Sequence, residues 1–106
     1  MKVEQLSKTL GGVLENHRLW VETNGEKGEQ LDLSRVDLRK VDLYEANLQG
    51  ANLCGVDLSE ADLHEAVLCR ADLRWANMSR VDLGHAYLSE ARLQGADLRN
   101  VDILGG

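Results

Sequence analysis

The side chains best suited to chemistry in this chain are three histidines, two cysteines and eighteen carboxylates. Their spacing matches no catalytic pattern: we find no Ser-His-Asp arrangement, no phosphate-binding Gly loop and no C-x-x-C metal motif. Cys54 and Cys69 are best explained as free surface thiols, which fit a reducing compartment. We therefore expect no catalytic residue, no cofactor and no metal site, and we expect that the protein is not an enzyme.

The residues are positioned by a sequence that repeats every five residues from Leu31 onward. The third position of each of the fifteen units is Leu, or once Met78 and once Ile103, and the first position is Ala, Val or Leu. Asp or Asn stands between them in twelve units. The exceptions are Val67, Tyr87 and Arg92. An internal repeat of this kind decides the architecture of a chain.

A period of five fits neither a long helix nor a straight strand. In a helix every fifth residue is rotated by about 140°, so the leucines would circle the axis. In a strand an odd period places successive leucines on opposite faces. Each unit must therefore contain a bend, and short extended segments that stack as a solenoid can bury the leucines together.

Units 61–65 (ADLHE), 71–75 (ADLRW) and 96–100 (ADLRN) resemble the pentapeptide-repeat family, whose consensus is A-(D/N)-L-x-x. The resemblance covers residues 31–105. It implies an all-β solenoid, a right-handed quadrilateral parallel β-helix with four units per coil, in which the first and third positions point inward. Fifteen units would make about 3.75 coils, a stack about 18 Å tall at a strand spacing of about 4.8 Å.

Residues 1–30 differ from the repeats, because apolar residues recur there at steps of three and four, which predicts a short amphipathic helix. Gly11-Gly12 could divide it in two, Asn24-Gly25 is a plausible stop, and Gly28 would keep the connector flexible. The residues of this pattern are Val3, Leu6, Leu10, Val13, Leu14 and His17.

Two segments of a single domain follow from this change of pattern. We expect residues 1–30 to form an N-terminal helical cap and connector, and residues 31–106 to form the β-helix. A cap is needed because the first coil would otherwise expose leucines and unpaired strand edges. For His17 and Trp20 we favour packing on the first coil over the alternative of a ligand site.

The four-per-coil geometry implied by the resemblance sorts the outward side chains into four walls. One of them, which we name the acidic wall, collects units 41–45, 61–65, 81–85 and 101–105. It holds six carboxylates and no Lys or Arg, whereas the other three walls sum to about +1. The carboxylates of this candidate interaction face are Asp42, Glu45, Asp62, Glu65, Asp82 and Asp102.

Exposed aromatic side chains often anchor protein interfaces, and Tyr44, Trp75 and Tyr87 occupy outward positions. Trp75 shares a column with Gly55 and Gly95, so its ring could instead lie over these glycines and shield the backbone. On the acidic wall, His64, Glu65 and His85 have suitable groups for a divalent cation. Outward side chains on a flat wall rarely converge on one ion, however.

We expect a non-catalytic protein-protein interaction module with an unknown protein partner. One alternative is a DNA mimic that binds gyrase or another nucleic-acid-binding protein through the acidic wall, because some members of the family resemble duplex DNA and bind DNA gyrase. This chain lacks their Phe residues and their C-terminal dimerisation helix, and about 18 Å covers only about five base pairs. Another alternative is a repeat domain of a larger or oligomeric assembly. The expected contact of an end-to-end homodimer is Leu98, Ile103 and Leu104.

The composition favours a soluble, intracellular protein, and residues 14–28 resemble a leader found ahead of other bacterial pentapeptide arrays, so we expect a bacterial cytoplasmic protein. The net charge is −6, and we expect no direct nucleic acid binding. No apolar run reaches the length of about 20 residues that a membrane span needs. The N-terminus also lacks the continuous apolar stretch of a signal peptide. We therefore expect neither membrane insertion nor export.

Overall fold

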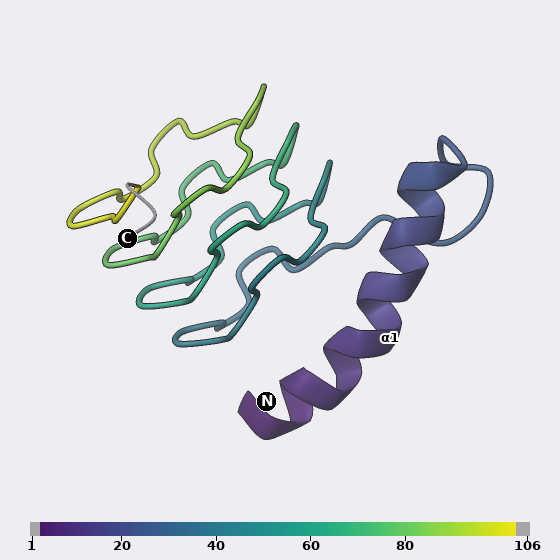
Figure 1. Cartoon of the computed structure of the whole chain (residues 1–106), viewed down its shortest axis with the longest axis horizontal. Helices are drawn as coiled ribbons and strands as arrows, with labels where there is room; N and C mark the ends of the chain where they lie inside the picture. Colours follow the sequence, from purple (N-terminus) through teal and green to yellow (C-terminus); the bar gives the residue numbers. More distant parts are fainter. Residues whose placement is uncertain (1–2, 104–106) are drawn as a thin grey trace.

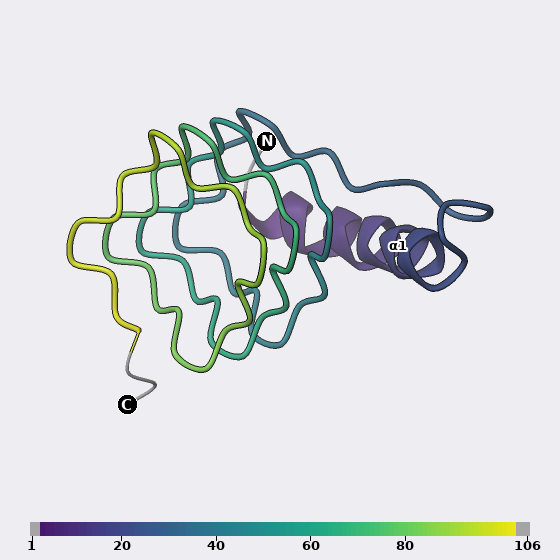
Figure 2. The ribbon, with the colours of Figure 1, turned by 90° about the horizontal axis from the view of Figure 1, so that it is seen from above.

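The computed structural model describes the backbone of residues 3–103 and the side chains of residue 12 and residues 14–103. In this part of the chain, the helix α1 (Val3–Glu22) is followed by a connector and a stack of short coils (Figure 1). Seen from two directions, the coils follow one another along a single axis, with the first coil next to α1 and the last coil, drawn in yellow, at the opposite end (Figures 1 and 2).

The coils are joined by parallel β-bridges between residues that are twenty positions apart, from Asp32 with Asn52 to Asp82 with Asp102. Twenty residues are four units of five, so the expected number of four units per coil is confirmed. Each bridge joins the second positions of two units. The bridges are isolated because each unit is extended only briefly before it turns.

Three backbone hydrogen bonds connect a unit with the unit one coil further on. Leu53 N–H donates to the Asp72 carbonyl and Gly55 N–H to the Arg74 carbonyl, both at 2.8 Å. Asp72 N–H donates back to the Ala51 carbonyl at 2.9 Å. The pattern recurs along the stack and satisfies the backbone groups of the inner coils, as in a parallel sheet.

Each unit turns directly after its leucine. Ala61 N–H donates to the Leu58 carbonyl at 2.9 Å, and Glu60, the fifth residue of the unit, has a φ of 61°. A positive φ at the third residue of a four-residue turn is the feature of a type II turn. This turn is the bend that the five-residue period requires.

The Asp or Asn at the second position fixes this turn. In eleven units of the described chain, its Oδ1 accepts a hydrogen bond from the N–H two residues later. Asp62 accepts from His64 at 2.9 Å, and Asn77 accepts from Ser79 at 3.1 Å. Such Asx turns explain the preference, because Asp and Asn both carry an Oδ1.

The first and third positions fill the interior, as predicted. The leucines between Leu38 and Leu73, together with Met78, are buried, and so are the small residues Ala51 and Ala71 between them. The last coil is open by comparison, since Leu98 is 44% exposed and Ile103 is 65% exposed. The hydrophobic core is therefore most completely buried in the middle coils.

The helix α1 runs without interruption from Val3 to Glu22, so Gly11-Gly12 does not divide it. It ends where the sequence predicts a stop. Asn24 has a φ of 54° and its N–H donates to the Val21 carbonyl at 3.3 Å, while Gly25 N–H donates to the Trp20 carbonyl at 2.8 Å. These two bonds and the left-handed residue make a Schellman motif.

The sequence predicts that Gly28 keeps the connector flexible, and the structure gives this glycine a further role in packing. Gly28 has a φ of 74°, and a Cβ built on it would lie 2.1 Å from the Asn16 carbonyl oxygen and 2.9 Å from Leu19 Cβ. The next residue, Glu29, donates its N–H to the same Asn16 carbonyl at 3.2 Å. Glycine is needed here because the connector is packed tightly against α1.

Candidate interaction surface

The structure brings the second-position aspartates of the acidic wall into one column. Asp42, Asp62, Asp82 and Asp102 are successive partners in parallel β-bridges. In the first three, Oδ1 accepts the N–H two residues later at 2.9 to 3.0 Å, so the carboxylates are held in a fixed orientation. Four carboxylates therefore lie above one another at steps of about 4.8 Å.

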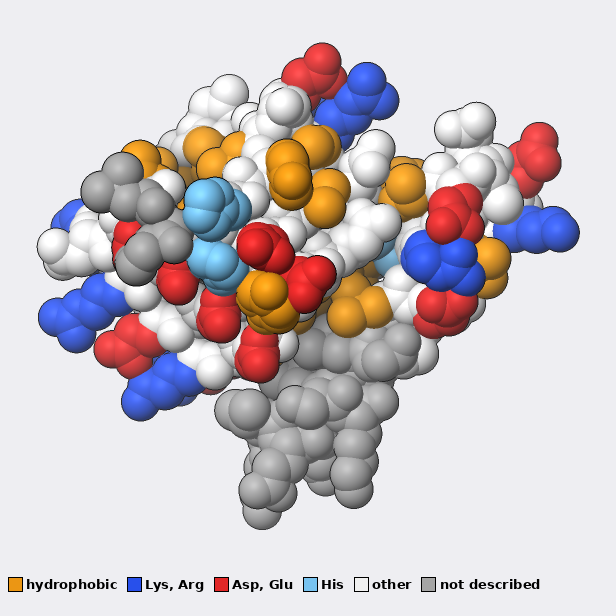
Figure 3. Space-filling view, viewed as in Figure 1, with side chains coloured by type: hydrophobic (Ala, Val, Ile, Leu, Met, Phe, Trp, Pro, Cys, Tyr) orange, Lys and Arg blue, Asp and Glu red, His pale blue; other side chains and the backbone are white. Residues whose placement is uncertain are grey.

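Aromatic side chains lie beside this column. The rings of Tyr44 and His64 stack with centroids 5.7 Å apart, and His85 meets His64 edge-on at 5.5 Å. The Tyr44 hydroxyl donates to Glu65 Oε2 at 3.2 Å, and His64 lies 3.8 Å from both Glu65 and Asp82. Figure 3 shows this face, with histidine, acidic and hydrophobic side chains next to one another and the Lys and Arg side chains toward its periphery.

The negative charge of the wall affects the Tyr44 phenol. The carboxylates of Glu45 and Glu65 raise the pKa of Tyr44, because the negative charge of a phenolate is unfavourable beside these two carboxylates. The electrostatic potential at this aromatic side chain is therefore negative. A basic group of a partner would be attracted to the same place.

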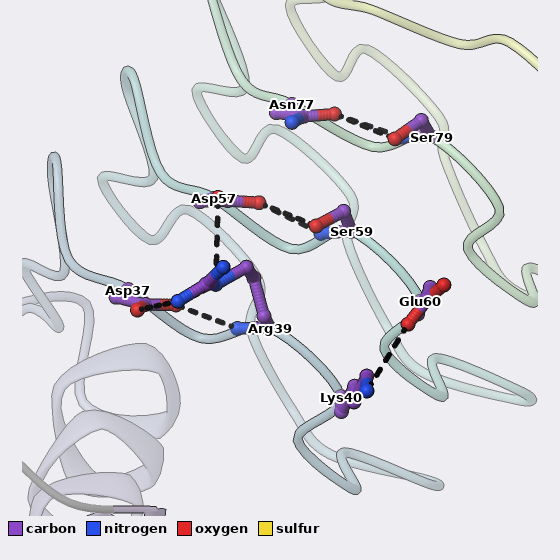
Figure 4. Close-up of polar contacts among 8 residues, drawn as sticks. All are labelled: Asp37, Arg39, Lys40, Asp57, Ser59, Glu60, Asn77 and Ser79. Atoms are coloured by element: carbon purple, nitrogen blue, oxygen red, sulfur yellow. Dashed lines mark hydrogen bonds and ion pairs between the residues drawn. The ribbon is translucent and has the colours of Figure 1, made fainter.

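The neighbouring wall carries carboxylates of a different kind. We name it the paired wall; it consists of units 36–40, 56–60, 76–80 and 96–100. Here Arg39 binds Asp37 at 2.9 Å and lies 3.9 Å from Asp57, and Lys40 lies 3.7 Å from Glu60 (Figure 4). The hydrogen bonds from Arg39 lower the pKa of Asp37. Its acidic side chains are matched by basic ones, whereas the units of the acidic wall contain no Lys or Arg.

A shallow groove follows the corner between the acidic wall and the next wall along the chain, which consists of units 46–50, 66–70 and 86–90. Its volume is about 450 Å³. The lining residues are Glu45, Glu65, Val67, His85 and Tyr87. Val67 and Tyr87 are two of the three positions at which the repeat lacks Asp or Asn, so the groove lies where the repeat departs from its consensus.

The predicted aromatic positions are all exposed, but they differ in surroundings. Tyr44 lies on the acidic wall and Tyr87 lines the groove, whereas Trp75 is on a different wall. A Cβ at Gly95 would lie 2.3 Å from Trp75 Cε3, so the Trp75 ring lies directly over that glycine. The structure thus favours the shielding interpretation for the inner face of this ring, while its outer face remains exposed.

His17 is packed at the junction of α1 and the first coil. It is fully buried, its Nε2–H donates to the Gln49 carbonyl at 2.7 Å, and its Nδ1 accepts the Leu31 N–H at 2.9 Å. Burial lowers the pKa of His17, which favours this neutral form. The Trp20 ring stacks on it at 5.5 Å. Both nitrogens are used within the fold, which supports packing and not a ligand site.

The sequence does not predict that His17 replaces a backbone hydrogen-bond donor of a preceding coil. In later coils a fifth-position N–H donates to a fourth-position carbonyl one coil further on, as Gly50 does to Cys69 at 2.9 Å. No coil precedes the Gln49 carbonyl within the described residues, and His17 Nε2–H takes the place of that donor. The sequence signal for this role of His17 was its position on the apolar side of the predicted helix.

The remaining expectations concern the C-terminal end, the cysteines, metal binding and membrane insertion. Leu98 and Ile103 are exposed at the C-terminal end, and Leu104 lies outside the described residues. Cys54 and Cys69 are free thiols. Among the residues that the structure describes, no group of three His, Cys, Asp or Glu side chains is arranged to hold a metal ion. No helix in the same part of the chain is long and apolar enough to cross a membrane.

Comparison with known proteins agrees with the fold. The family model for pentapeptide repeats matches residues 32–68, 46–84 and 70–105. Since these matches cover most of the chain, it belongs to the pentapeptide-repeat family. A search of curated proteins gives no match.

Solved structures of the same family are also similar. The pentapeptide repeat protein Rfr23 from the cyanobacterium Cyanothece 51142 is 32% identical, with a TM-score of 0.59, over 68% of this chain and 53% of that one. A pentapeptide repeat protein from the thylakoid lumen of Arabidopsis thaliana is 31% identical, with a TM-score of 0.41, over 71% of this chain and 56% of that one. This chain thus matches about half the length of each.

Proposed function

We propose that this pentapeptide-repeat protein is a non-catalytic interaction module that presents its acidic wall to a protein partner in the cytoplasm. The observation that carries the proposal is the contrast between two walls. The acidic wall has six carboxylates and no Lys or Arg, whereas the carboxylates of the paired wall bind Arg39, Lys40 and Arg99. A wall of one sign attracts and orients a basic surface.

The scaffold supports this use. In the right-handed quadrilateral β-helix that we propose, Leu and Ala side chains fill the interior. A partner would therefore contact the outward side chains of the walls. The aspartates are oriented by backbone N–H groups, which lowers the entropy that binding would cost. The free thiols of Cys54 and Cys69 fit a reducing compartment.

The test uses a variant that removes charge but keeps the fold. Asp62→Asn, Glu65→Gln and Asp82→Asn neutralise half of the wall, and Asn retains the Oδ1 that accepts the turn hydrogen bond. We expect affinity capture from cells of the source organism, quantified by mass spectrometry, to show at least a tenfold loss of the specific partners. Thermal unfolding establishes that the variant is folded.

The matched control carries the same charge change on the paired wall, as Asp37→Asn, Glu60→Gln and Asp97→Asn. Exposed ion pairs contribute little to stability, so this variant should also fold. It should capture the same proteins as the unmodified chain. Equal capture by the acidic-wall variant, or an equal loss in both variants, would contradict the proposal.

A DNA mimic is the second candidate, because the column from Asp42 to Asp102 is a regular line of negative charge. The six carboxylates of the acidic wall are spread over three steps of about 4.8 Å, or about 14 Å, which gives one charge per about 2.4 Å, whereas duplex DNA carries one per about 1.7 Å. The lower density favours an ordinary protein interface. Inhibition of gyrase supercoiling at micromolar protein would support the mimic, and its absence would exclude gyrase as the target.

For the oligomeric state we propose a homodimer through the C-terminal end. The exposed Leu98 and Ile103 are the observation behind it. We expect the mass in solution to be that of a dimer and to fall to that of a monomer in Leu98→Gln/Ile103→Asn. A strict monomer of the unmodified chain at high concentration would overturn this proposal.

A further inference from the structure

We propose that the groove at the corner of the acidic wall binds an exposed arginine side chain of the protein partner. The guanidinium would lie on the Tyr87 ring and donate to the carboxylates of Glu45 and Glu65. This inference rests on the proposed function, because it names the chemistry of the partner at the same surface.

The floor of the groove is apolar and aromatic at a position where the repeat needs neither property. Val67 and Tyr87 are β-bridge partners one coil apart, and neither side chain has the oxygen that makes an Asx turn. Tyr87 is nevertheless 60% exposed. The core does not require this ring, so its accessible face is available to a partner.

The rim of the groove is acidic. Glu45 and Glu65 occupy the same column one coil apart, and the Tyr44 hydroxyl holds one Glu65 oxygen at 3.2 Å. His85 follows in that column at the C-terminal end of the groove. Lys and Arg are absent from the whole acidic wall, and Arg70 on the adjacent wall is bound to Glu90 at 2.8 Å. The groove is therefore complementary to a positive charge.

The combination of floor and rim selects arginine. A guanidinium can stack on an aromatic face and at the same time donate to carboxylates in its own plane. The aliphatic part of the arginine side chain would cover Val67. Lysine provides the charge but not the planar donor set, so we expect it to bind less tightly.

The experiment uses three peptides as probes: acetyl-Gly-Arg-Gly-amide, its lysine analogue and its citrulline analogue, which keeps the shape of arginine without the charge. Each is titrated into the full ¹⁵N-labelled chain and followed by NMR. We expect the arginine peptide to shift the amide signals of Glu45, Glu65 and Tyr87 at millimolar concentration. The lysine peptide should bind more weakly, and citrulline should give no saturable shift.

Two variants locate the site. Tyr87→Asn restores the consensus residue, so the fold is retained, and we expect at least a fivefold weaker affinity for the arginine peptide. Trp75→Asn removes an exposed aromatic ring from a different wall and should leave the affinity unchanged. Three results would overturn the proposal that arginine binds in the groove: equal binding of citrulline, saturable shifts confined to other walls, or unchanged binding by Tyr87→Asn.

The same variants separate this inference from the proposed function. If capture of partners is lost with the acidic-wall variant but kept with Tyr87→Asn, the proposal of an arginine site in the groove is wrong. The acidic wall then remains the interaction surface. If the acidic-wall variant captures all partners of the unmodified chain, the proposed function itself is wrong. Loss of capture in both variants, with retention in the Trp75→Asn control, supports both.

Discussion

At the scale of single residues, the His17 side chain takes the place of two backbone hydrogen-bonding groups. Its imidazole accepts from the Leu31 N–H and donates to the Gln49 carbonyl, so the first coil is closed by a side chain of α1. The neutral form is required, because a protonated Nδ1 would point its hydrogen at the Leu31 N–H. We therefore expect the stability of this junction to depend on pH.

We predict that acid destabilises this junction. Burial lowers the pKa of His17 below its ordinary value of 6.5, so the unfolded chain binds the proton more readily than the folded chain. Stability from this group is complete above about pH 6.5 and falls as the pH decreases below it. The melting temperature of the unmodified chain should therefore drop between pH 7.5 and pH 5.5.

The variant His17→Gln isolates this effect, since it retains His64 and His85 but cannot titrate at position 17. It should be less stable at pH 7.5 and should lose less stability on acidification than the unmodified chain. Parallel curves of melting temperature against pH for the two proteins would show that His17 is not responsible.

At the scale of elements, two glycines illustrate opposite constraints on α1 and its connector. Gly12 lies inside α1, and a Cβ there would meet nothing within 4 Å. Gly28 has a positive φ and lies against the backbone of Asn16. The same substitution should therefore have opposite signs at the two positions.

We predict that Gly12→Ala raises the free energy of unfolding by about 1 kcal/mol, because alanine favours the helix. Gly28→Ala should lower it by about 2 kcal/mol or more, because the connector must move away from α1. Urea unfolding measures both. A neutral Gly28→Ala would mean that the connector is not packed as described.

The Asx turn allows a second prediction at this scale. Asn77→Asp keeps the Oδ1 that binds Ser79 N–H, whereas Asn77→Ala removes it. We expect Asn77→Ala to cost about 1 kcal/mol and Asn77→Asp to cost much less. If the two variants were equally stable in urea unfolding, the second position would not owe its preference to this hydrogen bond.

At the scale of the whole molecule, stability is concentrated in the middle of the stack. Leu63 is fully buried between two coils, whereas Leu98 is 44% exposed at the open end. We predict that Leu63→Ala lowers the free energy of unfolding by about 2–5 kcal/mol, and that Leu98→Ala lowers it by less than about 1 kcal/mol at a protein concentration low enough to dissociate the proposed C-terminal homodimer. Similar losses in urea unfolding at that concentration would contradict the open C-terminal end.

The fold was predictable because the signal is local and repeated. A period of five forces a bend in each unit, and Leu58 or Leu63 is inward whatever lies one coil away. The walls depend on which units are twenty residues apart, and that number came from the resemblance to the family. The bridges from Asp42 to Asp102 confirm it.

Other features were not predictable, since they depend on contacts between distant residues. The role of His17 depends on which backbone groups lie open at the first coil, and the close approach of Gly28 depends on the path of the connector. The groove requires Glu65 and Tyr87, from adjacent walls, to meet at one corner. Neither pattern nor composition contains that information.

The most direct test of the central claim is carboxyl labelling of the chain with and without the captured partner. A carbodiimide couples glycine amide to accessible carboxylates, and mass spectrometry locates the products. We predict that the partner protects Asp62, Glu65 and Asp82 on the acidic wall but leaves Glu60 and Asp97 on the paired wall reactive. Protection of the paired wall with a fully reactive acidic wall would contradict the account.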